Sequence, residues 1–96
     1  MTLDELLEEK REEILRIAAR HGARNVRVFG SVARGEASDL SDLDLLVQFE
    51  PGRSLLDHTA LVLELEELLG RKVDVVSEKG IDWLLRRRIL KEARPL

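Results

Sequence analysis

The chain has 96 residues, of which 44% are hydrophobic and 36% are charged, and it contains no cysteine. This length suits one domain with a small core, and the lack of cysteine excludes disulfides and thiolate zinc sites. The net charge of −3 argues against a domain that mainly grips nucleic-acid phosphates. No apolar run approaches the roughly 20 residues that span a bilayer, and the acid-rich N-terminus is unlike a signal peptide. We therefore expect one cytoplasmic domain over residues 1–96, without membrane or primary nucleic-acid partners.

The first half of the chain predicts a helix, a strand and a loop. Residues 3–21 carry apolar side chains at helical spacing, and Gly22 follows as a helix stop. Residues 25–29 predict a short strand in which Arg27 is partly exposed. Residues 31–41 contain few apolar side chains and predict at most one short helical turn before a loop. The turn and cap residues expected in that loop are Ser38, Asp39 and Ser41.

The second half alternates strands and helices. Residues 43–49 predict a strand buried on both faces, and residues 72–77 predict a third strand. Residues 55–69 predict a long helix with apolar side chains almost all round it, so this helix is either sandwiched in the core or shared with a partner, including a second copy of the chain. Residues 81–92 predict a closing helix whose apolar side consists of Ile81, Leu84, Leu85 and Ile89. We expect an α/β (α+β) fold with the order α, β, short α, β, α, β, α.

Two aspartates in the second predicted strand are the first sign of a site. Side chains alternate along a strand, so Asp42 and Asp44 point to the same face and their carboxylates converge. The two carboxylates repel each other, and burying them in an apolar segment costs solvation free energy. A cation or hydrogen-bond donors must offset both costs. Carboxylates are hard ligands suited to Mg²⁺ or Mn²⁺, and Mg²⁺ often joins one or two of them to substrate phosphates. The alternative to metal binding is that the two aspartates have a structural role and pair with other residues of the protein.

The order of the elements predicts which residues join this pair. A helical crossover normally makes the strands it connects parallel, which brings Asp74, near the start of the third strand, to the same end of the sheet as Asp42 and Asp44. Gly30 and Ser31 end the first strand. They reach that end only if the first strand runs antiparallel to the second. We therefore predict a small mixed sheet flanked by helices, although a nearby arginine that simply pairs with Asp74 is an alternative for that residue.

The Gly-Ser turn after the first strand has the features of a phosphate-binding segment. Gly30 allows close approach of the backbone to a ligand, and the following N–H groups and the Ser31 hydroxyl would cradle a phosphate. Arg34 would neutralise the charge of a triphosphate. The alternative is a surface ion pair between Arg34 and Glu36 or Asp39. Phosphates beside clustered carboxylates predict phosphoryl or nucleotidyl transfer with two divalent ions.

These residues also match a known family. Gly30-Ser31, ten intervening residues, Asp42-Leu43-Asp44 and the later Asp74 resemble the DNA polymerase β-like nucleotidyltransferase superfamily. The string GSVARGEASDLSDLDLLV is similar to its minimal nucleotidyltransferase branch. Matching motifs cover residues 29–47 and 73–76, and the order of elements fits nearly the whole chain.

The resemblance implies specific roles. Asp42, Asp44 and Asp74 would hold two Mg²⁺ or Mn²⁺ ions and perform catalysis, with Asp74 helping to deprotonate the acceptor. Ser31 would hold the nucleotide phosphate. In the best-understood setting of this branch, the small protein is the antitoxin of a HEPN-type toxin and transfers AMP from ATP to a tyrosine of that toxin.

Two other functions stay open on the sequence alone. A non-catalytic module with the same fold would neutralise its partner by binding and occlusion. A small-molecule nucleotidyltransferase of the aminoglycoside-modifying kind is disfavoured, because the sequence offers no second substrate-binding domain. Residues 86–88, three consecutive arginines, form either a solvated face or a docking surface for an acidic or nucleic-acid partner, and Trp83 is expected in the core or in an interface.

Overall fold

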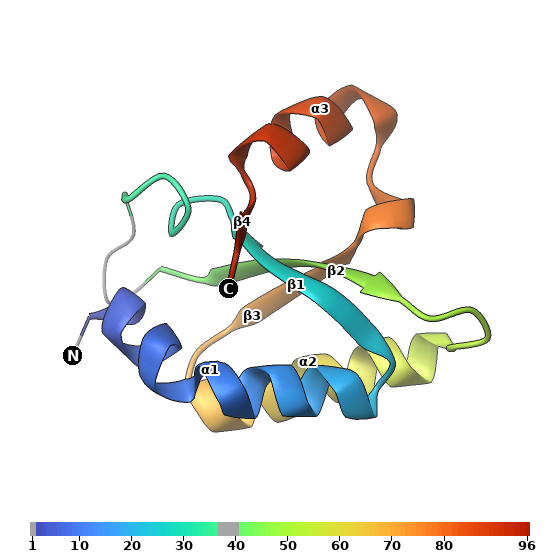
Figure 1. Ribbon diagram of the computed structural model, residues 1–96, viewed down its shortest axis with the longest axis horizontal. Helices are drawn as coiled ribbons and strands as arrows, with labels where there is room; N and C mark the ends of the chain where they lie inside the picture. Colours follow the sequence, from blue (N-terminus) through green and yellow to red (C-terminus); the bar gives the residue numbers. More distant parts are fainter. Residues whose placement is uncertain (1, 37–40) are drawn as a thin grey trace.

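The computed structural model describes residues 2–36 and 41–96 as a small sheet with helices on both faces (Figure 1). The elements in chain order are α1 (Leu3–Arg20), β1 (Ala23–Phe29), β2 (Leu43–Phe49), α2 (Leu55–Leu69), β3 (Val73–Ser77), the 3₁₀ turn η1 (Glu78–Gly80), α3 (Trp83–Glu92) and β4 (Arg94–Pro95). No helix in the described part of the chain is long and apolar enough to cross a membrane.

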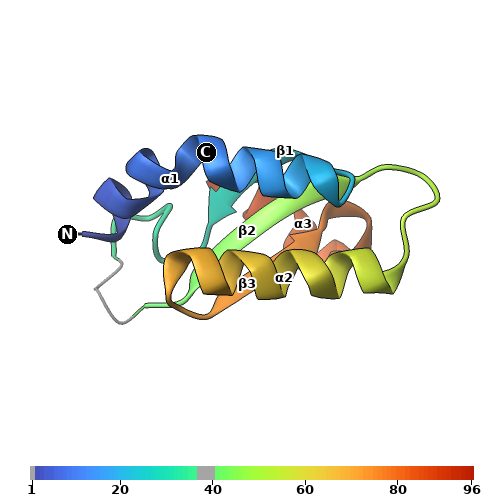
Figure 2. The ribbon, with the colours of Figure 1, turned by 90° about the horizontal axis from the view of Figure 1, so that it is seen from below.

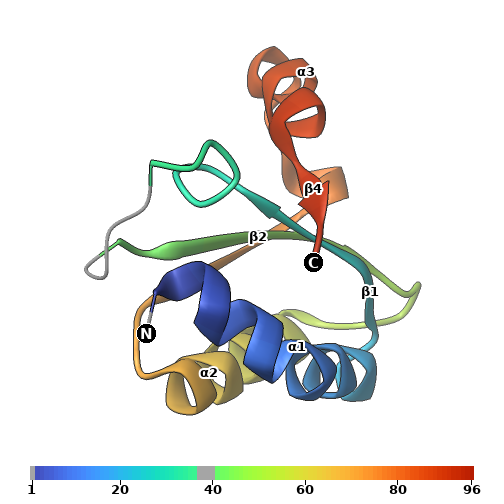
Figure 3. The same ribbon diagram turned by 60° about the vertical axis from the view of Figure 1, so that its left-hand side comes forward.

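The sheet is mixed, as the sequence predicts. Its strand order is β3-β2-β1-β4, with β2 parallel to β3 and β1 antiparallel to both β2 and β4. The helices α1 and α2 lie side by side on one face of the sheet, as the view from below shows (Figure 2). The third helix, α3, stands on the opposite face (Figure 3). The residues that end β1 and those that begin β2 and β3 therefore meet at one end of the sheet.

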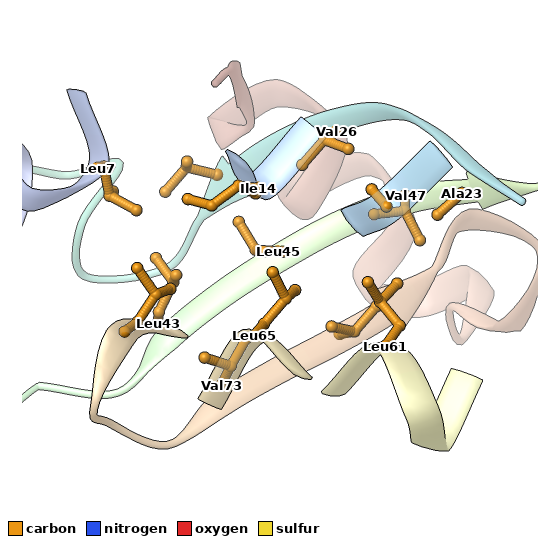
Figure 4. Close-up of a cluster of buried hydrophobic side chains, with 14 of the residues drawn as sticks. Leu7, Ile14, Ala23, Val26, Leu43, Leu45, Val47, Leu61, Leu65 and Val73 are labelled. Carbon is orange, nitrogen blue, oxygen red and sulfur yellow. The ribbon is translucent and has the colours of Figure 1, made fainter. Parts of the chain in front are cut away.

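The core lies between the sheet and the two long helices. Alternate residues of β2, Leu43, Leu45 and Val47, face Ile14 of α1 and the buried leucines of α2 (Figure 4). The buried positions of α2, Leu61, Leu65 and Leu69, follow each other at intervals of four and so lie along one stripe of the helix. This packing fixes which face of β2 is turned away from the helices. Asp44 and Leu46 lie on that second face.

Capping residues define where the two long helices begin. The side chain of Thr2 caps α1 and the side chain of Ser54 caps α2, and each forms a reciprocal capping box with the acidic residue three positions later. At the other end of α2, Gly70 takes the left-handed conformation that closes many helices. Local sequence therefore sets the limits of both core helices.

A bulge interrupts β1. Arg24 pairs with Gln48, whereas Arg27 pairs with Leu46, so three steps along β1 match two steps along β2. The extra residue is accommodated at Asn25, whose φ of 53° is left-handed. As a result Arg24 and Arg27 lie on the same face of the sheet despite their odd spacing.

The helix α3 differs from the closing helix expected from its pattern. None of its residues is buried, and Trp83, Leu84 and Leu85 are 79%, 69% and 51% exposed. Of the two positions expected for Trp83, the core is therefore excluded, and a position in an interface stays a prediction. A hydrophobic stripe shows which side chains share a side of a helix, but whether that side packs depends on how the neighbouring segments place the helix.

The helix α2 is only partly inside the protein. Leu55, Leu56 and Leu63 are 77%, 81% and 60% exposed, while the opposite stripe packs in the core. A helix sandwiched in the core is thus excluded, and the exposed leucines agree with the alternative of a surface shared with a partner.

Other differences from the sequence predictions are local. The strand β1 begins at Ala23, two residues before the predicted strand, and β4 was not predicted. Residues 31–35 form hydrogen-bonded turns instead of a short helix. The predicted turn residues Ser38 and Asp39 lie outside the described residues, whereas Ser41 precedes β2.

Candidate functional site

Two of the predicted carboxylates lie side by side in the sheet. Asp44 of β2 is the direct neighbour of Asp74 in β3, and on its other side it pairs with Phe29 of β1. Neighbouring strands are about 4.8 Å apart, and paired residues of parallel strands share a face. Asp42, which precedes β2, is exposed. The topology therefore brings the carboxylates of Asp44 and Asp74 together on the face opposite the core helices.

The Asp44 carboxylate also packs over Gly30. Gly30 has a φ of 74°, and a Cβ built at this position would lie 2.2 Å from Oδ2 of Asp44. Any other residue would both strain the backbone and displace the carboxylate. Gly30 is thus required by the turn conformation and by the close approach of Asp44.

The electrostatics of Asp44 reflect this crowding. Burial raises the pKa of the Asp44 carboxyl, the negative charges of Asp74, Asp42 and Glu92 raise it further, and Arg34 lowers it. The positive charges in the described part of the chain therefore do not fully offset the effects of burial and of the neighbouring negative charges on the pKa of Asp44. A site of this kind favours an added cation.

The turn after Gly30 presents backbone donors beside these carboxylates. The carbonyls of Gly30, Ser31 and Val32 accept hydrogen bonds from residues 34–36, whereas the N–H groups of Ser31 and Ala33 donate none of these turn bonds. Arg94 secures the turn from outside, because its guanidinium donates to the Val32 carbonyl at 3.1 Å. The turn therefore leaves backbone N–H groups for an anion.

Arg34 is held by carboxylates. It forms an ion pair with Glu36 at 3.2 Å and a shorter one with Glu92 at the end of α3. The expected surface ion pair is thus present with Glu36, while the other expected partner, Asp39, lies outside the described residues. Because the charge of Arg34 also lowers the pKa of Asp44, the guanidinium lies within electrostatic reach of the carboxylates. To neutralise a phosphate, it would have to exchange these partners for the ligand.

Three residues that support the site were not singled out for it from sequence. Glu92 and Arg94 contact the turn from 58 and 62 positions away, and Arg71 donates to the Ser41 carbonyl from 30 positions away. The last contact holds the backbone next to Asp42. An arginine and a carboxylate far apart in sequence carry no local signal of such contacts, so only the fold reveals them.

The carboxylates fit a metal ion that is completed by substrate. Within residues 2–36 and 41–96, no three His, Cys, Asp or Glu side chains are grouped to hold a metal ion by themselves. The paired carboxylates of Asp44 and Asp74 instead suit Mg²⁺, which is often bound by one or two carboxylates together with phosphates and water. The raised pKa of Asp44 agrees with a position that a cation would stabilise.

Comparisons with known proteins place this chain in a family. The nucleotidyltransferase domain family matches residues 7–96. A relative from Methanocaldococcus jannaschii named "putative protein adenylyltransferase" is 46% identical over 87 residues, which cover 91% of this chain and 94% of that protein. The protein adenylyltransferase MntA of Thermococcus cleftensis is 38% identical over 92 residues, which cover 96% of this chain and 93% of that protein.

Solved structures agree with this assignment. The structure of a "putative minimal nucleotidyltransferase" has a TM-score of 0.89 and 61% identity, and the match covers 100% of this chain and 97% of that one. A more distant fold likeness, with a TM-score of 0.70 and 16% identity, covers 92% of this chain and 69% of a chain from a tri-AMPylated Shewanella oneidensis HEPN toxin in complex with its MNT antitoxin. The chain therefore belongs to the nucleotidyltransferase domain family, in its minimal branch, and is a nucleotidyltransferase.

Proposed function

We propose that the protein transfers AMP from ATP to a tyrosine hydroxyl of a HEPN-type toxin and thereby acts as the antitoxin of that toxin, in the cytoplasm. The observation that carries this proposal is the pairing of Asp44 with Asp74 beside the Gly30 turn. The names of the curated relatives support AMP as the transferred group. The likeness in fold to an antitoxin bound to an AMPylated HEPN toxin supports the class of acceptor.

In the proposed reaction, the turn binds the nucleotide and the aspartates bind the metal ions. The Gly30-Ser31 turn and the Ser31 hydroxyl hold the ATP phosphates, and Arg34 neutralises the triphosphate after leaving its carboxylate partners. Asp42, Asp44 and Asp74 hold the metal ions. When bound by these aspartates, two Mg²⁺ or Mn²⁺ ions would supply Lewis acidity for the transfer.

The bond changes follow from these positions. Asp74 helps to take the proton of the tyrosine hydroxyl, the tyrosine oxygen forms a bond to the α-phosphorus, and the bond to pyrophosphate breaks. Asp74 is suited to this task because it is exposed at the edge of the pair, whereas Asp44 is partly buried over Gly30. An acceptor side chain can therefore approach Asp74 from solvent.

The helix α3 supplies a surface for the toxin on the same side of the sheet. Its exposed side chains Trp83, Leu84 and Leu85 are followed by three exposed arginines, residues 86–88. Apolar and arginine side chains of this kind are typical of protein interfaces, and their charge suits an acidic surface on the toxin. Because Glu92 at the C-terminal end of the same helix contacts Arg34, a toxin that binds along α3 would extend toward the proposed catalytic residues.

The test must separate catalysis from occlusion. The purified protein is incubated with the toxin, Mg²⁺ and ATP labelled at the α-phosphate, and the labelled toxin peptide is identified by mass spectrometry. We expect label on a tyrosine with the wild type and none with Asp44→Asn, which should also fail to neutralise the toxin. If Asp44→Asn binds and neutralises the toxin as well as the wild type, the protein acts by occlusion and the catalytic proposal is wrong. Glu50→Gln, an exposed position just past the far end of β2 and six residues beyond Asp44, is the matched control.

A further inference from the structure

A cavity opens on the α3 side of the molecule, at the end of the sheet opposite the aspartates. Its volume is about 290 Å³, at the small end of ligand sites, and Gln48 at the end of β2 and Arg86 of α3 are among its walls. Gln48 lies four residues beyond Asp44 on the same face of β2, which corresponds to roughly 13 Å along the strand. The cavity is thus separate from the aspartates of the proposed catalytic site.

The bulge in β1 turns an arginine into this cavity. In a regular strand Arg24 and Arg27 would point to opposite faces, but the extra residue at Asn25 puts both on the face of Gln48. Asn25 adopts a left-handed φ of 53°, a conformation that few non-glycine residues take. The sheet therefore departs from regular geometry at the point where Arg24 reaches the cavity wall.

The charges around the cavity do not balance. Glu78 accepts hydrogen bonds from Arg27 at 2.6 Å and from Gln48 at 2.7 Å, and the Arg27 and Glu78 side chains are only 14% and 16% exposed. These contacts lower the pKa of Glu78, so it stays ionised, and both Arg27 and Arg86 pair with its carboxylate. Its single negative charge therefore offsets only one of the four cations at the cavity, Arg24, Arg27, Lys79 and Arg86. A local excess of about three positive charges stands out in a chain whose net charge is −3.

The cations differ in how firmly they are held. Arg86 is fixed by hydrogen bonds to the carbonyl and the carboxylate of Glu78, at 2.9 and 3.3 Å. Arg24 and Lys79 are exposed and form no ion pair within the described parts of the chain. The fixed guanidinium of Arg86 and the unpaired cations of Arg24 and Lys79 together suit an anion with several acceptor oxygens.

We propose that this cavity binds a small phosphate-bearing anion at a site distinct from the catalytic one. Arg24, Lys79 and Arg86 would contact the phosphate oxygens, and Phe49 and Pro51 provide an apolar wall for any attached organic group. The same chemistry is offered by inorganic phosphate or pyrophosphate and by the phosphate of a nucleotide. This inference does not depend on the proposed AMP transfer.

The site is tested by NMR titration of the ¹⁵N-labelled protein with phosphate, pyrophosphate and AMP, each without divalent ions. We expect saturable shifts of the amide signals of Arg24, Gln48 and Lys79. The double variant Arg24→Gln/Lys79→Gln should weaken binding about tenfold or more, because it removes two charged contacts. The matched control Arg87→Gln/Arg88→Gln loses the same net charge from exposed positions on α3 that do not line the cavity, and should bind within about twofold of the wild type.

The results of the titration identify which phosphate compound binds and whether it binds in the cavity or at the catalytic site. Equal affinity for phosphate and AMP identifies the phosphate group alone as the ligand, whereas tighter binding of AMP identifies a nucleotide. Shifts confined to residues 30–36 and 42–44, or equal weakening in both double variants, would overturn the proposal. Thermal unfolding of each variant within a few degrees of the wild type shows that a loss of binding is not a loss of fold.

Discussion

Gly30 and Asp44 depend on each other at the site. The left-handed turn at Gly30 leaves the space that the Asp44 carboxylate fills, and the parallel register of β2 and β3 places this carboxylate beside Asp74. The Gly-Ser and Asp-Leu-Asp motifs can be recognised separately in the sequence. Their contact cannot, because it depends on the antiparallel pairing of β1 with β2.

Replacing Gly30 by alanine should impair function more than stability. Gly30→Ala and the matched control Gly52→Ala both place alanine at a positive φ, so each should lower the free energy of unfolding by about 1 kcal/mol. Nothing lies within 4 Å of a Cβ at Gly52, but at Gly30 the new methyl group forces the Asp44 carboxylate aside. AMP transfer by Gly30→Ala should therefore fall about a hundredfold. Equal activity of the two variants, measured beside urea denaturation, would show that the Gly30–Asp44 contact is irrelevant.

The charge of Asp44 should destabilise the folded protein at neutral pH. Because its pKa is raised in the folded state, the protonated Asp44 carboxyl contributes to the free energy of unfolding. This contribution is fully present below the ordinary aspartate pKa and is lost as the pH rises through the raised pKa. Without divalent ions, Asp44→Asn should therefore have a higher Tm than the wild type at pH 7, and the difference should disappear as the pH falls toward the ordinary aspartate pKa. The exposed variant Glu9→Gln serves as the control. A lower Tm for Asp44→Asn at pH 7 would contradict the electrostatic account of Asp44.

Magnesium should reverse this order if the aspartates bind it. A ligand that binds only the folded state raises the Tm, so Mg²⁺ is expected to stabilise the wild type more than Asp44→Asn. The measurement is thermal unfolding over a series of Mg²⁺ concentrations with a constant ionic strength. An equal effect of Mg²⁺ on both proteins would remove Asp44 from the proposed metal ligands.

Among the elements, those that bury a continuous apolar pattern were predictable. The bounds of β2 and α2 agree with the predictions, because β2 is a nearly continuous apolar run and α2 has a serine cap and a glycine stop. The strand β4 has only two residues and pairs with Arg27 and Val28 of β1, so its existence depends on a contact distant in sequence. The position of α3 is equally non-local, since its apolar side chains do not enter the core.

The contact between α3 and Arg34 should restrain nucleotide binding. The Glu92 side chain is only 15% exposed, whereas the second partner of Arg34, Glu36, is 65% exposed and its pairing is correspondingly weak. Glu92→Gln should free Arg34 for the triphosphate and lower the KM for ATP about fivefold, with little change for the control Glu36→Gln. Arg34→Gln should raise the KM. If Glu92→Gln raises it as well, Glu92 positions Arg34 for the nucleotide instead of holding it back.

Across the whole molecule, one face of the sheet forms the core and the other carries the proposed binding sites. One face carries α1, α2 and the core, and the other carries the proposed catalytic aspartates, α3 and the cationic cavity (Figure 3). The sequence predicted the mixed sheet because a helical crossover makes β2 and β3 parallel, whereas Gly30 and Ser31 reach the aspartates only if β1 runs antiparallel to β2. It did not predict the cavity, because that site depends on a bulge and on the position of α3.

The exposed leucines of α2 should support self-association. Leu56 and Leu63 are two turns apart, and in an antiparallel pair of α2 helices each would contact the other residue of the second copy. We expect a concentration-dependent dimer in sedimentation velocity experiments, which Leu56→Glu/Leu63→Glu abolishes and Leu84→Glu in α3 does not. A wild-type protein that stays monomeric at high concentration would exclude this dimer.

The most direct measurement of the proposed function is the intact mass of the toxin after incubation with the protein, ATP and Mg²⁺. The account predicts that the toxin gains one or more AMP units, that Asp44→Asn adds none, and that Glu50→Gln behaves like the wild type. A toxin that forms a complex with the wild-type protein under these conditions but gains no AMP would contradict it.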